Sequence, residues 1–296
     1  MKRLEWVVPE HLEGRVLRDV LRRELGISGK GLTRMKQSPG AILQNGAPVF
    51  VNVRVVAGDT LTLCLEDDAV SETILPTPGE IDVVFENEDL LVVNKPAGLA
   101  VHPAPGDRTQ TLANFVVWKY QMVYRPVNRL DRGTSGLMVV AKNAYSHAAL
   151  AKQLHTDFVR EYQAVVHGHP TPEAGTICAP IARLPGSVLK RTVAEDGAPA
   201  TTHYRVERKG EGVSLVRLRL ETGRTHQIRV HMAHLGHPLV NDFLYGTEEP
   251  ERIAWCALHS AHLALTLPFS GECLVCDAPL PIEMQNLLKD GPNCET

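Results

Sequence analysis

The sequence predicts an α+β protein, in which a large, mainly antiparallel sheet carries helices on its face and follows a small N-terminal module of two helices and a few strands. Strand-like segments dominate the second half of the chain, at 203–209, 213–221, 262–267 and 272–277. This pattern differs from the regular βα alternation of a doubly wound fold. The chain contains no G-x-G-x-x-G and no G-x-x-x-x-G-K-[ST] segment, so dinucleotide and P-loop sites lack support.

The composition is that of an ordinary globular protein. A length of 296 residues suggests about two domains. With 44% hydrophobic and 22% charged residues, the chain is neither disordered nor fibrous. No apolar run approaches the roughly 18–20 residues that cross a bilayer, and the start lacks the apolar segment of a secretory signal. We therefore expect a cytoplasmic protein with no membrane partner, whose six cysteines are reduced.

The charge is unevenly distributed. The chain has a net charge of −3, but residues 125–236 contain 16 Lys and Arg against 9 Asp and Glu. The rest of the chain is therefore acidic, with a net charge of −10. A basic region on an acidic protein favours a polyanionic partner.

Residues 1–68 read as the small module. Apolar residues at helical spacing predict a helix over 12–25, and Ser28 is a plausible N-cap for a second helix ending at Lys36. Strands are expected at 41–43, 49–55 and 61–65, the first two joined by a hairpin turn at Asn45-Gly46. The arginines of the first helix form either an RNA-binding surface or a solvated face. A linker at 69–80 then leads to a second domain at 81–296.

The second domain begins with a predicted hairpin, with strands at 81–85 and 90–94. A helix at 111–120, a buried strand at 137–142, a helix at 145–155 and a strand at 160–166 follow. A further helix is expected at 225–235, with Thr225 as N-cap and Gly236 at its end.

The segment Arg125-Pro-Val-Asn-Arg-Leu-Asp-Arg-Gly-Thr-Ser-Gly136 is the densest chemical signal. Asp131 lies between Arg129 and Arg132, in a glycine-containing turn before a buried strand. Neighbouring cations favour the ionised carboxylate, which suits a nucleophile or a general base. The same residue could equally cap the turn and pair with its neighbours.

Two other segments contribute candidate residues. Strand alternation places Arg160 and Tyr162 on one face of 160–166, so the Tyr162 ring could stack on a base or could simply belong to the core. Arg229 lies in the first turn of the helix predicted at 225–235. A cation there opposes the helix dipole and needs an anion, either Asp131 or a phosphate.

With these segments in view, the chain resembles the RluA/RluD-type pseudouridine synthases. The resemblance rests on Arg129-Leu-Asp131 with Thr134-Ser-Gly136, on Glu161-Tyr162, and on Gly223-Arg-Thr-His-Gln-Ile-Arg-Val-His231. Asn94-Lys-Pro-Ala-Gly98, Val101-His-Pro103 and Leu258-His-Ser260 also fit. It covers roughly residues 81–285, with an S4-like RNA-binding module in front. It implies the pseudouridine synthase fold, and the conversion of uridine in structured RNA to pseudouridine without cofactor or metal.

The resemblance also implies residue roles. Asp131 is the catalytic aspartate, which either attacks C1′ of the ribose or first takes the C2′ proton. Tyr162 is a second catalytic residue, which stacks on the uracil and is the candidate base for removal of the C5 proton. Arg229 is the third, as the salt-bridge partner of Asp131. Ile228 packs near the base, and Arg129 fills the place that the target base leaves. Further substrate-binding positions are Asn128, Arg132, Arg224, His226 and Lys95. Asn128 departs from the family, which usually has His there.

A metal site is the main alternative in the sequence. His231, His234 and His237 could approach a metal ion, but Gly236 and Pro238 end the helix before His237. Cys273 and Cys276 lie three apart in a predicted strand and so point to opposite faces. Large-subunit ribosomal RNA is the expected substrate, with tRNA as the alternative, and a monomer is expected. A catalytically silent RNA-binding protein on the same scaffold is the second hypothesis.

Overall fold

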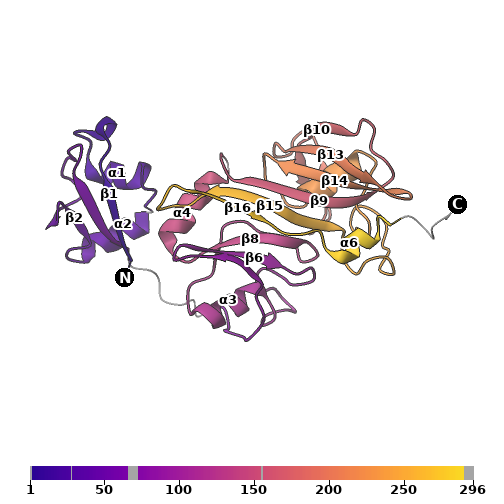
Figure 1. Cartoon of the computed structure of the whole chain (residues 1–296), viewed down its shortest axis with the longest axis horizontal. Coiled ribbons are helices and arrows are strands. Elements are labelled where there is room, and N and C mark those ends of the chain that lie inside the picture. Colours follow the sequence, from indigo (N-terminus) through magenta and orange to yellow (C-terminus); the bar gives the residue numbers. More distant parts are fainter. Residues whose placement is uncertain (1, 28, 66–72, 155, 290–296) are drawn as a thin grey trace.

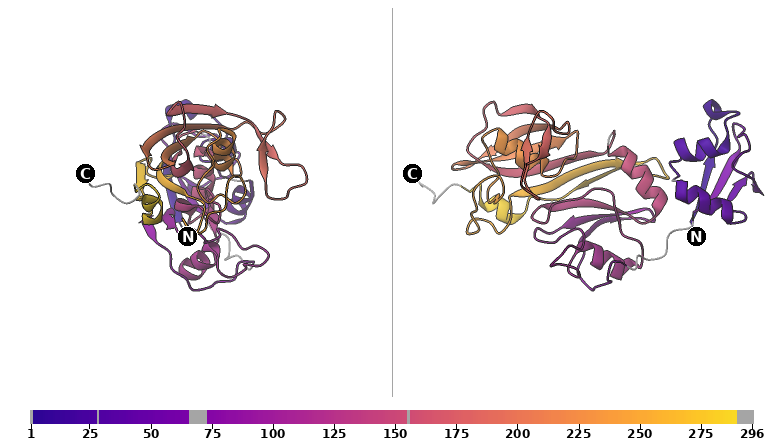
Figure 2. Two further views of the ribbon diagram at one scale, coloured as in Figure 1. Left: turned by 90° about the vertical axis from the view of Figure 1, so that its right-hand side faces the viewer. Right: turned by 180° about the vertical axis from the view of Figure 1, so that it is seen from behind.

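The computed structural model describes residues 2–27, 29–65, 73–154 and 156–289 (Figure 1). The N-terminal residues form a four-stranded sheet in the order β1-β4-β2-β3, with its own hydrophobic cluster. Its elements are β1 (Lys2–Val7), η1 (Glu10–Leu12), α1 (Leu17–Arg23), α2 (Gly29–Gln37), β2 (Ile42–Gln44), β3 (Ala47–Pro48) and β4 (Thr60–Leu65). This unit lies at one end of the long axis of the molecule (Figures 1 and 2). Ser28, the predicted N-cap of α2, lies outside the described residues.

Two predictions for this unit are wrong. Residues 49–55 do not form a strand, because the carbonyls of Val51 and Val53 accept hydrogen bonds at 2.8 Å from the first amides of α1. These residues therefore satisfy a helix start instead of a sheet edge. The first helix begins at Leu17 and not at residue 12, since Gly14 has a φ of +70° and Val16 forms a β-bridge. Strand β1 was not predicted.

A ten-stranded sheet dominates the rest of the chain, in the order β10-β13-β14-β9-β15-β8-β6-β5, with β16 beside β15 and β7 beside β8. The described pairs are antiparallel except β8 with β15. The strands are β5 (Val83–Glu86), β6 (Leu90–Lys95), β7 (Arg125–Pro126), β8 (Ser135–Ala141), β9 (Val159–His167), β10 (Ala174–Cys178), β13 (Thr201–Lys209), β14 (Val213–Leu220), β15 (Leu258–Thr266) and β16 (Cys273–Asp277). The predicted mainly antiparallel α+β architecture is confirmed.

Strand alternation divides this sheet into two buried faces. In β6, Leu91 and Val93 pack into one cluster, whereas Leu90 and Val92 pack into another on the opposite face. Every residue of β8 is buried. A strand that is covered on both faces reads as a continuous apolar run.

The helices that cover the sheet are α3 (Leu112–Tyr120), α4 (Ala144–Gln153), α5 (Gln227–His234) and the short α6 (Ile282–Asn286). Helix α3 and helix α5 contribute to the same hydrophobic cluster, and α4 packs on the other side through Leu150. Thr111 caps α3 in a capping box with Asn114, as the predicted start of that helix required. A hairpin of β11 (Ile181–Arg183) and β12 (Arg191–Val193) packs beside α5. Among the described residues, no helix is long and apolar enough to cross a membrane.

Candidate active site

The strand order brings together two segments that are distant in sequence. Strand β15 lies between β8 and β9, and Ser260 of β15 pairs with both Gly136 and Tyr162. The turn that precedes β8 carries Asp131, so this turn lies close to Tyr162. The strands approach so closely that a Cβ on Gly136 would lie 2.2 Å from the carbonyl oxygen of Ser260. Only glycine fits this crossing, where φ is +105°.

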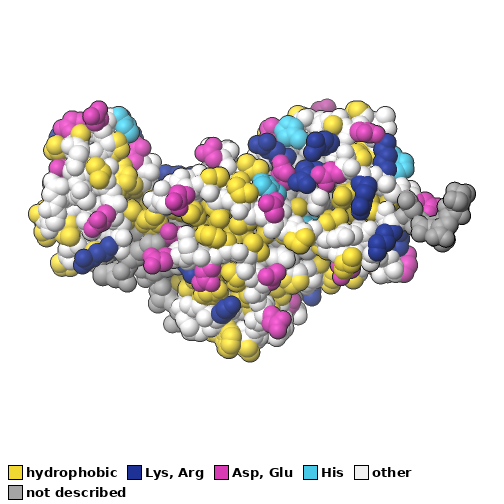
Figure 3. Space-filling model, viewed as in Figure 1, with side chains coloured by type: hydrophobic (Ala, Val, Ile, Leu, Met, Phe, Trp, Pro, Cys, Tyr) yellow, Lys and Arg dark blue, Asp and Glu magenta, His cyan; other side chains and the backbone are white. Residues whose placement is uncertain are grey.

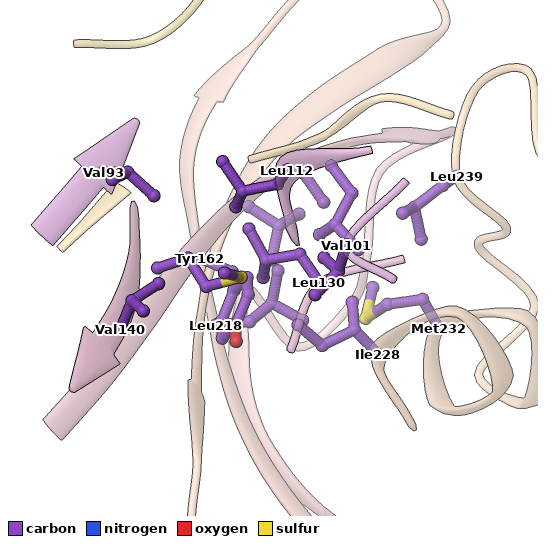
Figure 4. Close-up of a cluster of buried hydrophobic side chains, with 14 of the residues drawn as sticks. Val93, Val101, Leu112, Leu130, Val140, Tyr162, Leu218, Ile228, Met232 and Leu239 are labelled. Carbon is purple, nitrogen blue, oxygen red and sulfur yellow. The ribbon is translucent and has the colours of Figure 1, made fainter. Parts of the chain in front are cut away.

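A pocket of about 540 Å³ opens at this junction, within the size range of small-molecule sites. Eight of the ten predicted site residues line it, namely Asn128, Arg129, Asp131, Tyr162, Arg224, His226, Ile228 and Arg229. Its apolar wall belongs to the main hydrophobic cluster. Figure 4 shows Leu130 and Val101 between the strands on one side and Ile228 and Met232 of α5 on the other.

Asp131 is partly exposed in this pocket, with 35% of its side chain accessible. Its Oδ2 lies 3.5 Å from Nη1 of Arg229 and 3.7 Å from Nε2 of His226. Its backbone carbonyl accepts a hydrogen bond from the amide of Thr134 at 3.0 Å, which closes the turn. The site therefore presents an accessible carboxylate next to a buried cation.

The predicted contact between Arg229 and Asp131 is present, but Asp242 is the stronger partner. Arg229 donates from Nε and Nη2 to the two Asp242 oxygens, at 2.8 and 2.6 Å, and Asp242 is fully buried. Burial lowers the pKa of Arg229, but the hydrogen bonds to Asp242 and the nearby acidic groups, Asp131 among them, together raise this pKa above its ordinary value. This role of Asp242 was not predicted, because only the fold brings a loop 13 residues downstream back to the helix.

Helix α5 starts later than predicted. Its N-cap is His226, in the left-handed region at φ 58°, and not Thr225. The side chain of Gln227 explains the difference. Its Oε1 accepts hydrogen bonds from the Arg224 amide and the Thr222 hydroxyl, and its Nε2 donates to the Thr201 carbonyl. These bonds impose a non-helical shape on residues 222–226.

Tyr162 and Arg160 lie on the same face of β9, as the alternation predicts, and both line the pocket. Tyr162 is 6% exposed and hydrogen-bonds to Ser260. Burial raises the pKa of its hydroxyl, so the group stays protonated at neutral pH. Arg160 is 8% exposed, and its buried Nε has no hydrogen-bond partner among the described residues. Arg160 was placed on this face from the sequence but was not selected as a site residue, because its unpaired Nε becomes apparent only in the fold.

The other pocket residues differ in accessibility. Arg129 is exposed at the rim, whereas Ile228 is 4% exposed within the apolar wall. Arg224 is exposed and donates from Nε to the Pro199 carbonyl at 3.0 Å. Asn128 is buried, and its Oδ1 accepts a hydrogen bond at 2.8 Å from the amide of Val139. An amide at this position therefore fastens the Asp131 turn to β8 without an imidazole ring.

Lys95 and Arg132 do not line the pocket. Lys95 is 1% exposed, and its ammonium donates to the carbonyls of Pro96, Leu99 and Arg132 at 2.8, 2.9 and 3.2 Å. This burial disagrees with the predicted direct contact of Lys95 with RNA and gives it a role in the shape of the turn. Arg132 is exposed outside the pocket, and its Nε donates to the carbonyl of Gly98 at 2.9 Å.

The histidines and cysteines that were considered as metal ligands do not converge on a common site. Both ring nitrogens of His231 lie 2.9 Å from protein oxygens, those of Thr202 and Ala179. Cys273 is exposed and Cys276 is buried, on opposite faces of β16. No cluster of three or more metal-ligating side chains occurs within the described part of the chain.

Basic side chains gather over β13 and β14, as Figure 3 shows at its upper right. Exposed members are Arg205, Arg208, Lys209 and Arg219. Acidic residues lie among them, and Arg217 pairs with Glu161 at 2.9 Å and with Glu207. The basic region of the sequence therefore forms a surface whose charge is partly neutralised by internal pairs.

Comparisons with known proteins agree with this site. A family model described as RNA pseudouridylate synthase matches residues 89–234. An uncharacterized RNA pseudouridine synthase of Bacillus subtilis (strain 168) is 42% identical over 272 residues, which cover 90% of this chain and 96% of that protein. The chain belongs to the RNA pseudouridine synthase family. As a pseudouridine synthase it is an isomerase that acts on uridine in RNA, and the resemblance seen in the sequence motifs is confirmed.

Two further comparisons, one with a sequence and one with a solved structure, also match pseudouridine synthases. Ribosomal large subunit pseudouridine synthase D of Zymomonas mobilis is 43% identical over 275 residues, which cover 86% of this chain and 84% of that protein. The solved structure of human RNA pseudouridylate synthase domain containing 1 superposes with a TM-score of 0.57 at 29% identity. That match covers 68% of this chain and 85% of the human one, so the two share the fold.

Proposed function

We propose that this pseudouridine synthase isomerises a uridine of large-subunit ribosomal RNA, with Asp131 as the catalytic residue. The observation that carries the proposal is the accessible Asp131 carboxylate in a pocket with the Tyr162 ring and Ile228, next to the buried Arg229. The name of the Zymomonas mobilis relative supports the choice of RNA.

The proposed reaction needs the target base outside the RNA stack, because its C1′ and C5 atoms are otherwise unreachable. Arg129 at the rim occupies the place that the base vacates, since a guanidinium can stack on neighbouring bases. In the pocket, the Tyr162 ring stacks on the uracil and Ile228 contacts its other edge. Arg160 offers its unpaired Nε to a phosphate or a base oxygen.

Asp131 then acts on the ribose, at C1′ as a nucleophile or at C2′ as a base. The bond between N1 and C1′ breaks, the uracil turns and C5 bonds to C1′. On the nucleophilic route the ester between Asp131 and C1′ breaks in that step, and on the other route the C2′ proton returns from Asp131. The C5 proton leaves while N1 gains one. No atom is gained or lost overall, so the reaction balances without a further reactant, and we propose that it uses neither cofactor nor metal. Arg229 stabilises the carboxylate charge between the steps.

The proposal extends to the organisation of the protein. Residues 1–68 act as an S4-like RNA-binding module, residues 69–80 as a linker and residues 81–296 as the catalytic domain. The basic surface over β13 and β14 supplies phosphate contacts that do not depend on sequence. The enzyme works as a monomer in the cytoplasm, where ribosomal RNA is modified.

The test is tritium release from C5 of labelled uridine, with EDTA present, on transcribed large-subunit ribosomal RNA and on tRNA. Asp131→Asn should abolish release but keep RNA binding. Asp277→Asn, a matched change at an exposed carboxylate on β16, should keep both.

Each other outcome overturns a stated part of the proposal. Release from tRNA alone would overturn the ribosomal substrate. Full release by Asp131→Asn would overturn the catalytic assignment. Binding of both RNAs with release from neither would favour an RNA-binding protein without catalysis.

A further inference from the structure

His226 has an unusual conformation for the N-cap residue of a helix. It lies in the left-handed region (φ 58°, ψ 20°), and its side chain makes no capping hydrogen bond. The imidazole points instead toward the pocket, with Nε2 3.7 Å from Oδ2 of Asp131 and Nδ1 2.8 Å from the hydroxyl of Tyr245. Strained backbone that turns a side chain into a site is a common feature of functional positions.

The hydrogen bonds of Tyr245 determine which nitrogen of His226 carries the proton. The hydroxyl oxygen of Tyr245 accepts a hydrogen bond at 2.9 Å from the backbone N–H of Arg191, the first residue of β12. A phenol has a single proton to donate, and the acceptor within reach is Nδ1 of His226. This arrangement favours an unprotonated Nδ1, with the proton on Nε2.

The other side of the imidazole requires the same tautomer. An ionised carboxylate only accepts hydrogen bonds, so Asp131 favours an N–H on the facing Nε2. Burial lowers the pKa of His226. The charges of Asp131 and Asp242 raise this pKa, and those of Arg229 and Arg191 lower it. The result is a neutral ring at neutral pH.

The two groups around Asp131 contact the same oxygen. Arg229 and His226 both approach Oδ2, so Oδ1 is the oxygen that is available to the substrate. We infer that His226 is a positioning residue. With its Nε2–H tautomer fixed by Tyr245, it acts with Arg229 to orient the Asp131 carboxylate so that Oδ1 faces the target ribose. This inference rests on the proposed catalytic role of Asp131.

The first test is kinetic. Tyr245→Phe removes the hydroxyl that fixes the tautomer, and it should lower kcat about tenfold, the worth of one hydrogen bond in the transition state, with KM changed less than about twofold. In a His226→Gln background, which has no tautomer to fix, the same change should add no further loss. Tyr204→Phe is the matched control, because it removes a buried hydroxyl bonded to the Pro172 carbonyl outside the pocket.

The second test is spectroscopic and needs neither RNA nor turnover. The ¹⁵N shifts of the His226 ring, assigned by their absence in His226→Gln, should report Nε2–H in the wild type and a mixture of tautomers in Tyr245→Phe. An Nδ1–H or doubly protonated ring in the wild type at neutral pH would overturn the inference, as would wild-type kcat in Tyr245→Phe. A wild type with the expected tautomer that forms no pseudouridine in any RNA would instead overturn the proposed function.

Discussion

Replacing Asp242 by Asn should both destabilise this pseudouridine synthase and slow its reaction. The Asp242 side chain is fully buried and that of Arg229 is 6% exposed, and two short charge-assisted hydrogen bonds join them. Removing one charge of a buried pair costs about 3–5 kcal/mol, because the other charge stays buried without compensation. Asn keeps one oxygen as an acceptor, so we expect the free energy of unfolding to fall by about 2–3 kcal/mol.

Urea unfolding of both proteins measures this loss as a shift in the transition midpoint. At about 2–4 °C per kcal/mol for a domain of this size, the melting temperature should fall by about 4–12 °C. Glu161→Gln makes the same chemical change in a partly exposed pair, where Glu161 accepts from Arg217 at 2.9 Å. That control should cost about 0–1 kcal/mol.

The reaction rate is an independent measure of the effect of Asp242→Asn. Without Asp242, the Arg229 guanidinium has Asp131 as its nearest carboxylate and should pair with it more tightly. A carboxylate in a close ion pair is less reactive, so single-turnover pseudouridine formation should slow. If Asp242→Asn is no less stable than Glu161→Gln and reacts at the wild-type rate, the reasoning about the buried pair is wrong.

Three further predictions concern the supporting structure and the RNA. Gly98→Ala should destabilise the fold by about 1–3 kcal/mol in urea, because φ is +87° and the new Cβ would lie 2.8 Å from the Trp255 ring; an unchanged midpoint would contradict this. Burial lowers the pKa of Lys95 to about 7 from its ordinary 10.5. Between these values the unfolded chain binds a proton that the folded chain has released, so the free energy of unfolding should rise with pH relative to Lys95→Met, and parallel pH curves would refute it. RNA affinity should fall steeply with salt in filter binding, and a flat dependence would remove the role of the basic surface.

Local patterns were sufficient for much of the fold. The alternation in 213–221 predicted β14, and the apolar run at 137–142 predicted the buried β8. The helix predicted at 111–120 is α3, which agrees to within one residue. These features depend on neighbours within a few positions, so the sequence contains the information directly.

Features that depend on distant residues were predicted less well. Residues 49–55 alternate like a strand, but their carbonyls satisfy the start of α1, more than 30 positions earlier in the chain. Thr225 looks like an N-cap, yet Gln227 ties the preceding loop to β13 and moves the helix start. In both cases a tertiary hydrogen bond outweighed a valid local preference.

The surroundings of Arg229 show that a correct rule about charge at a helix start does not identify which anion pairs with it. A cation in the first turn of a helix needs an anion, and that rule predicts either Asp131 or a phosphate beside Arg229. The fold supplies two carboxylates, and it assigns them different tasks. Asp242 takes the bidentate contact and is buried, so Arg229 presents only Nη1 to Asp131 at 3.5 Å. A bidentate pair with Asp131 would have engaged both of its oxygens; the division between two aspartates leaves Oδ1 of Asp131, the proposed catalytic residue, open to the RNA.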